Sequence, residues 1–99
     1  MRRTRVLLID KPGFSKDVIA ALIADQPDTQ LVCDAPDVVI IDDRELAGAL
    51  DSLDREIPVI VLGADDDPAY AARARRIGAH WVAKDAAATD LPRILSGRV

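Results

Sequence analysis

Aromatic residues are scarce in this chain, and so is cysteine. The 99 residues include one Phe, one Tyr, one Trp and a single cysteine, Cys33. So few aromatic side chains argue against a stacking platform for single-stranded nucleic acid. One cysteine excludes an internal disulfide and fits a reducing compartment, so we expect a cytoplasmic protein. Cys33 itself is expected to be a buried thiol in a strand.

The chain also lacks a long apolar run and an excess of positive charge. No apolar stretch approaches the roughly 20 residues that a membrane-spanning helix needs, and the basic start is followed by a run too short for a signal peptide. Seventeen acidic and thirteen basic residues give a net charge of −4. This balance argues against nucleic acid as a partner. The length suits one domain, predicted to span residues 1–99.

Three apolar segments each end at a charged residue. Residues 38–41 are four β-branched apolar residues followed by Asp42, a pattern typical of a strand buried on both faces of a parallel sheet. Two other apolar segments end in the same way, one at Asp10 and one at Lys84. In parallel sheets the carboxyl ends of the strands form the edge where ligands bind. We therefore predict that Asp10, Asp42 and Lys84 meet at one corner of the molecule.

The apolar periodicity along the rest of the chain predicts alternating strands and helices. Strands are expected at residues 5–9, 29–33, 38–41, 57–62 and 80–83. Helices are expected at residues 16–25, 44–56, 68–77 and from Thr89 or Asp90 through Leu95. The first helix has Ser15 as its predicted N-cap and an apolar stripe of Val18, Ile19, Leu22 and Ile23. This alternation predicts an α/β fold, a three-layer sandwich with helices on both faces of a sheet.

The third of these helices carries signals at both ends. The acidic run 65–67 precedes it, with Asp67 as the predicted N-cap and Pro68 at the first helical position. Gly78 is the predicted stop. We interpret the acidic run as helix-start charge rather than a metal cluster. His80, the only histidine, is expected at a rim or in a loop.

The connection between the second and third strands is too short for an ordinary crossover. Consecutive parallel strands are normally joined by at least about 10–12 residues, usually a helix. Here Val32 and Val38 are separated by five residues, which span roughly 20 Å when extended. Three possibilities remain open. The second strand is vestigial, its helix has been lost, or it pairs antiparallel.

With these elements in place, the chain resembles the receiver domain of two-component response regulators. The resemblance covers nearly the whole length and is best over residues 57–94. It is carried by the strands that end at Asp10 and Asp42 and by a later segment containing Trp81 and Lys84. It implies a flavodoxin-like parallel sheet whose second crossover helix is missing or vestigial. It also implies a signalling protein of a phosphorelay that is not an enzyme.

The resemblance assigns roles to residues at the predicted corner. Asp42 would be the phosphoacceptor. Asp42, Asp10 and the backbone carbonyl of Arg44 would hold Mg²⁺, which neutralises the approach of two anions. The positions that would contact the phosphoryl group are Lys84 and the backbone amide of Ala64. The switch positions would be Gly63 and Trp81.

The sequence departs from the family's pattern at Lys11 and at Gly63. The second acid expected after the first strand is replaced by Lys11, unless a one-residue deletion places Asp10 at that second position; both registers remain open. Unit charges 4 Å apart interact by about 1 kcal/mol in water and about 4 kcal/mol at an effective dielectric near 20. Lys11 would therefore act as a pocket modifier that weakens Mg²⁺ binding. Gly63 replaces a threonine or serine and lacks the hydroxyl that would pull Trp81 inward.

Two functions therefore remain open. In the first, the domain is a pseudo-receiver that acts through protein–protein contacts, with degenerate phosphorylation chemistry and weak or absent Mg²⁺. In the second, it is a functional phosphoacceptor that takes a phosphoryl group on Asp42 from a histidine kinase with Mg²⁺. The expected partner in both is a protein, either a histidine kinase, a phosphotransfer protein or a downstream regulator. A homodimer through the helix 68–77, strand five and the last helix is a further option. No glycine-rich loop supports a nucleotide binder.

Overall fold

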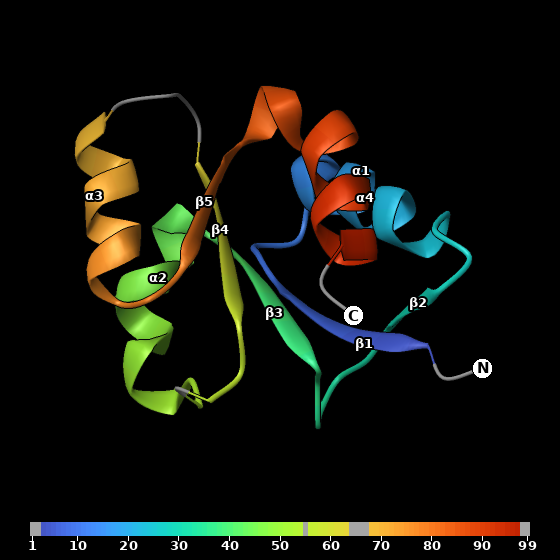
Figure 1. The fold of residues 1–99 in the computed structure, drawn as a ribbon, viewed down its shortest axis with the longest axis horizontal. Helices are drawn as coiled ribbons and strands as arrows, with labels where there is room; N and C mark the ends of the chain where they lie inside the picture. The colour runs from blue at the N-terminus through green and yellow to red at the C-terminus, as the bar shows by residue number, and fades with distance from the viewer. Residues whose placement is uncertain (1–2, 55, 64–67, 98–99) are drawn as a thin grey trace.

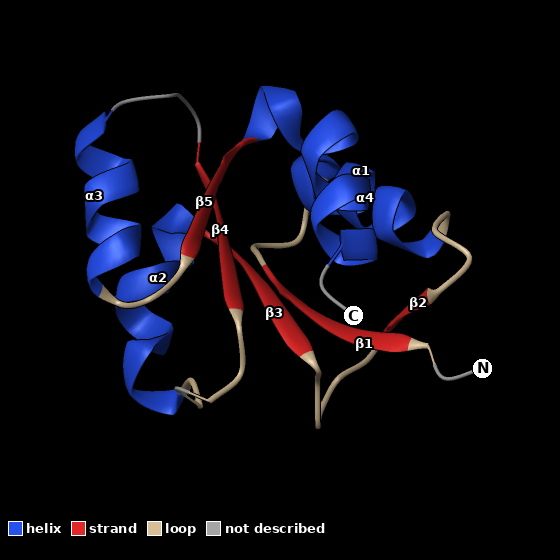
Figure 2. Cartoon of the chain, viewed as in Figure 1, coloured by secondary structure: helices blue, strands red, loops and turns tan. Residues whose placement is uncertain are grey.

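The computed structural model describes residues 3–54, 56–63 and 68–97. Five parallel strands form one sheet in the order β2-β1-β3-β4-β5 (Figure 2). The strands are β1 (Thr4–Ile9), β2 (Thr29–Leu31), β3 (Val38–Asp42), β4 (Val59–Gly63) and β5 (His80–Ala83). All five residues of β3, the central strand, are buried. The predicted doubly covered strand is thus confirmed.

Helices cover both faces of this sheet (Figure 1). One face packs against α1 (Phe14–Ala24) and α4 (Ala87–Gly97), and the other against α2 (Asp43–Ala49) and α3 (Pro68–Arg76). Short 3-10 turns, η1 (Leu50–Ser52) and η2 (Lys84–Ala86), follow α2 and precede α4. Alternate residues of β3 enter the two cores, because successive strand side chains point to opposite faces. The three-layer α/β prediction is confirmed.

The register of β2 explains how the chain reaches β3 without a crossover helix. Leu31, at the end of β2, lies opposite Val6 of β1, and Val38, at the start of β3, lies opposite the same residue on its other side. The chain therefore does not return along the sheet. The loop between β2 and β3 passes from one side of β1 to the other, a lateral distance of about 10 Å for two strand spacings. Of the three possibilities, the structure has a vestigial parallel strand with no helix after it.

An ion pair holds the entry to β3 against β1. The backbone amide of Arg5 donates to Oδ2 of Asp37 at 2.9 Å, and its guanidinium donates to both carboxylate oxygens at 3.4 and 3.2 Å. The amide of Asp37 in turn donates to the carbonyl of Arg5 at 2.8 Å. Four hydrogen bonds between two residues thus anchor the loop that replaces the helix.

We expect Asp37→Ala to lower the free energy of unfolding by about 1–3 kcal/mol, because it leaves the Arg5 groups without these acceptors. Urea unfolding of the wild type and the variant measures the loss. Asp34→Ala is the matched control, since Asp34 lies exposed in the same loop. Equal effects of the two substitutions would contradict this role for Asp37.

Several predicted boundaries differ from those observed. The first helix begins at Phe14, so Ser15 lies inside its first turn, and Gly13 occupies the N-cap position without a side-chain cap. Val18 is 43% exposed and does not belong to the buried stripe. Cys33 is exposed in the loop rather than buried in a strand, because β2 already ends at Leu31.

The other differences concern element lengths. The second helix ends at Ala49 and continues only as the 3-10 turn η1, and β4 begins at Val59, after Pro58. The last helix begins at Ala87, directly after η2, and therefore contains Pro92. Strand β5 has its predicted bounds.

The stop of α3 agrees with the prediction from Gly78. This glycine has φ +75°, a left-handed conformation that terminates a helix without strain. The amide of the following residue, Ala79, donates back to the carbonyl of Ala74 at 2.9 Å. Asp67, the predicted N-cap of the same helix, lies outside the described residues. None of the described helices is long and apolar enough to cross a membrane.

Candidate functional site

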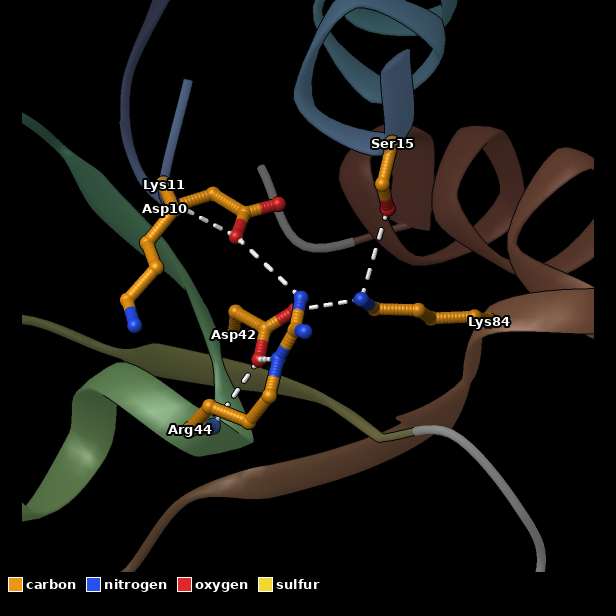
Figure 3. Close-up of polar contacts among 6 residues, drawn as sticks. All are labelled: Asp10, Lys11, Ser15, Asp42, Arg44 and Lys84. Carbon is orange, nitrogen blue, oxygen red and sulfur yellow. Dashed lines mark hydrogen bonds and ion pairs between the residues drawn. The ribbon is translucent and has the colours of Figure 1, made fainter. Parts of the chain in front are cut away.

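Charged side chains from three parallel strands meet at the carboxyl edge of the sheet (Figure 3). Asp10 follows β1, Asp42 ends β3 and Lys84 follows β5. Both carboxylates are buried, Asp42 to 2% exposure. The ammonium of Lys84 pairs directly with Oδ2 of Asp42. The predicted convergence of Asp10, Asp42 and Lys84 on one corner is therefore present.

A second cation, the guanidinium of Arg44, also binds Asp42. Its Nε donates to Oδ1 at 3.1 Å and a terminal nitrogen donates to Oδ2 at 3.3 Å. The backbone amide of Arg44 donates to Oδ1 at 2.8 Å. Asp42 thus has two cations and one amide as partners. A buried carboxylate needs such partners, because an uncompensated charge away from water is costly.

The side chain of Arg44 links the two acids of the corner. A terminal guanidinium nitrogen lies 3.9 Å from Oδ1 of Asp10 while the same group is bound to Asp42. Arg44 reaches this position from the first turn of α2 and is 64% exposed. The sequence reading used only its backbone carbonyl, as a metal ligand. In the first turn of a helix that carbonyl points along the helix toward its C-terminus.

Sequence reasoning therefore missed the side chain of Arg44. The available signal was its place two residues after a strand-end acid, at the start of a helix. That spacing lets an arginine fold back on the acid it follows. The same spacing occurs in many surface helices, so it becomes informative only when the acid is known to be buried.

Lys11 contacts the corner through its backbone rather than through its ammonium group. Its side chain is exposed and points away from Asp42 (Figure 3), and it forms no ion pair with a residue that the structure describes. Its backbone amide donates to Oδ1 of Asp10 at 2.8 Å. The positive charges in contact with the two acids come from Arg44 and Lys84. The second oxygen of Asp10, Oδ2, is buried and has no hydrogen-bond partner among the described residues.

Lys84 also connects the corner to α1. Its ammonium donates to the hydroxyl of Ser15 at 3.3 Å while it pairs with Asp42. Ser15 therefore contributes to this corner rather than capping its helix. Its position in the first turn of α1 brings the hydroxyl to the edge where β3 and β5 end (Figure 3).

The electrostatic balance at Asp42 favours its charged form. Burial alone raises the pKa of this carboxyl group, but hydrogen bonds from Arg44 and Lys84 outweigh burial and lower the pKa from 3.8 to about 2. Asp42 in turn raises the pKa of Arg44. The carboxylate and its two cations thus form a unit that stays charged in mildly acidic solution.

This unit makes stability depend on pH in a defined window. Because the folded pKa is below the unfolded one, the stabilisation is complete above about pH 4 and is lost as the pH falls through about 2. We expect Asp42→Asn to remove this component, worth about 1–2 kcal/mol after allowance for solvent screening. Urea unfolding from about pH 5 to about pH 2 measures it. Asp51→Asn, an exposed carboxylate, should keep the wild-type slope. An unchanged slope in Asp42→Asn would contradict the prediction.

The remaining predicted positions are placed as follows. Gly63, at the end of β4, lies under the indole ring of Trp81. Ala64 and the acidic run 65–67 lie outside the described residues. His80 is exposed at the start of β5, at the opposite edge of the sheet.

The corner offers carboxylate oxygens to a metal ion. The described part of the chain holds no group of three or more His, Cys, Asp or Glu side chains that could bind one. Asp10 and Asp42 are two carboxylates, and a guanidinium already lies against both. Mg²⁺ is commonly held by one or two carboxylates and waters, so Asp10 and Asp42 would be the residues to hold it, in competition with the guanidinium of Arg44.

The fold is similar to that of a solved protein structure. No protein-family model matches the sequence, and no curated protein matches it. Among solved structures, the chain is similar to the signal receiver domain of the response regulator NarL from Mycobacterium tuberculosis, with a TM-score of 0.76 and 21% sequence identity. The match covers 99% of this chain and 100% of that chain. The chain therefore has the flavodoxin-like fold of a receiver domain.

Proposed function

We propose that the chain is a receiver-like signalling domain of a bacterial two-component system that acts through protein–protein contacts, with degenerate phosphorylation chemistry. The receiver fold and the corner of Asp10, Asp42 and Lys84 support a signalling role. The observation that carries the degenerate chemistry is the Arg44 guanidinium bound across both acids.

Arg44 opposes phosphorylation in two ways. A divalent cation that approached the two acids would meet a bound positive charge, and even unit charges at 4 Å repel by about 1–4 kcal/mol between water and an effective dielectric near 20. In addition, both oxygens of Asp42 accept charge-assisted hydrogen bonds. One oxygen must lose these bonds before it can attack a phosphoryl group, and such bonds are stronger than neutral ones.

Gly63 supports the same proposal. In a receiver-type mechanism a hydroxyl at this position would follow the phosphoryl group and move the aromatic residue of β5. Glycine has no side chain for this task, whatever happens at Asp42. Phosphorylation, if it occurred, would lack this route to the surface of the domain.

The functional phosphoacceptor is the second candidate, and two observations favour it. The side chain of Arg44 is 64% exposed, so that it can leave the corner at modest cost. The Oδ2 atom of Asp10 is buried and has no partner among the described residues, which makes it an available oxygen ligand for Mg²⁺. In this alternative Asp42 takes the phosphoryl group from a histidine kinase.

The proposed partners are proteins: a histidine kinase, a phosphotransfer protein or a downstream regulator. A homodimer through α3, β5 and α4 remains a prediction, as does a cytoplasmic location. The proposed role is a binding and signalling role rather than an enzymatic one. Mg²⁺, where it binds, is expected to bind weakly.

Incubation with acetyl phosphate and Mg²⁺, followed by intact-mass measurement, tests the proposal. We expect no gain of the about 80 Da that a phosphoryl group adds in the wild type. Asp42→Asn is the control for the site of any adduct. An adduct that forms on the wild type and is absent from Asp42→Asn would decide for the phosphoacceptor.

The counter-ion role of Arg44 predicts a gain of Mg²⁺ affinity when its charge is removed. We expect Arg44→Gln to bind Mg²⁺ at least about tenfold more tightly than the wild type, since about 1.4 kcal/mol of repulsion is relieved. Isothermal titration calorimetry measures the two affinities. Arg93→Gln is the matched control, because Arg93 pairs with Asp90 on the exposed side of α4. Sub-millimolar binding of Mg²⁺ by the wild type would contradict the proposal.

A further inference from the structure

The indole of Trp81 occupies the space that a side chain at position 63 would need. A Cβ atom built on Gly63 would lie 1.8 Å from Cη2, 1.9 Å from Cζ2 and 2.8 Å from Cζ3 of Trp81. Carbon atoms that are not bonded approach each other to about 3.5–4.0 Å. Alanine is therefore already too large for position 63 while the ring stays where it is.

Space, rather than backbone conformation, is the reason for a glycine here. Among the described glycines, those with a positive φ are Gly13 and Gly78. Gly63 is a regular residue of β4 and is paired with Ala83 of β5. Any residue could adopt its backbone, and only glycine leaves room for the ring.

The sheet register directs the ring to this place. Trp81 lies opposite Val61, and Gly63 is the next residue of β4 on the same face, since strand side chains alternate. A large aromatic side chain reaches its diagonal neighbour across two strands. The ring packs against the core that α2 and α3 cover, and its Nε1 atom is buried. Trp81 is therefore a partly buried residue whose ring lies against this core.

Position 63 lies at the same edge of the sheet as Asp42, but on the other face. Asp42 is registered with Leu62, so Gly63 is one residue farther along β4 at the same edge. Strand side chains alternate, so Asp42 follows the face of Ile40, whereas position 63 follows the face of Val61. A side chain at position 63 would therefore lie on the face of Trp81, and glycine leaves that place to the ring.

We propose that Gly63 and Trp81 form a fixed wedge that holds the β5–α3 side of the domain in one conformation, independent of the charge at Asp42. This proposal rests on the proposed function for one point, that a partner protein binds the β5–α3 side. On that basis, the partner would meet a surface whose conformation does not change with Asp42. The mechanism itself rests on the packing of Trp81 against Gly63.

Unfolding and tryptophan fluorescence of a Gly63→Ala variant test the wedge. We expect this substitution to raise the unfolding equilibrium constant at least about tenfold, because overpacking forces the ring to move. The emission of Trp81 should shift to longer wavelength and be quenched more by acrylamide. Gly48→Ala is the matched control, since a Cβ at Gly48 meets no atom within 4 Å. Equal behaviour of the two variants would overturn the proposal.

A second-site variant guards against simple misfolding of the first. In a Trp81→Leu background, which lacks the indole ring, Gly63→Ala should change the unfolding equilibrium constant much less. We expect at most about a third of the fold-change seen when Trp81 is present, because the two positions are in contact. Urea unfolding of the four proteins gives this comparison. Additive effects would overturn the wedge.

The independence from Asp42 is tested separately. Asp42→Asn should leave the emission maximum and acrylamide quenching of folded Trp81 unchanged, and so should acetyl phosphate with Mg²⁺ on the wild type. A change in either case would overturn the proposal. If the wild type gains a phosphoryl adduct while the emission stays constant, the degenerate chemistry fails and the wedge stands.

Discussion

A carboxylate removed from water needs positive charge or hydrogen-bond donors around it, and Asp42 has both at the end of the central strand. Lys84, from the end of β5, and Arg44, from the start of α2, bind its two oxygens. These contacts join β3 to β5 and to a helix on one face of the sheet. Ser15 extends the same network to α1, on the other face. The contacts around one buried carboxylate thus link β3, β5 and helices on both faces of the sheet at this edge.

The fold is shortened around β2, where a three-residue strand leads to β3 without a helix. The charged corner is not affected by this. Strand β2 stops at the level of β1 where β3 begins, so the connecting loop crosses β1 and needs no helix. The Arg5–Asp37 pair anchors that loop at the amino end of the strands. Asp10 and Asp42 lie at the opposite, carboxyl end. Shortening the fold at one end is therefore compatible with an intact corner at the other.

The corner and the wedge support the same view of the domain from separate contacts. In the proposed function, Arg44 supplies the positive charge that receiver-type chemistry takes from a metal ion. Gly63 lets Trp81 fill the space that a responding side chain would use. As proposed, the first feature keeps Asp42 neutralised and the second keeps the aromatic residue of β5 in place. Each would remove a step that otherwise depends on a phosphoryl group.

The sequence by itself determined the strands, the alternation of layers and the meeting of Asp10, Asp42 and Lys84, because buried runs and the charges that end them are local patterns and parallel strands share one edge. It also located the irregular connection before Val38 without choosing its geometry. Only the tertiary structure decided that the guanidinium of Arg44, rather than the ammonium of Lys11, lies against both acids, and that Trp81 fills the space above Gly63. Such pairings depend on where a helix turn or a neighbouring strand places a side chain in three dimensions, and no local pattern records that distance.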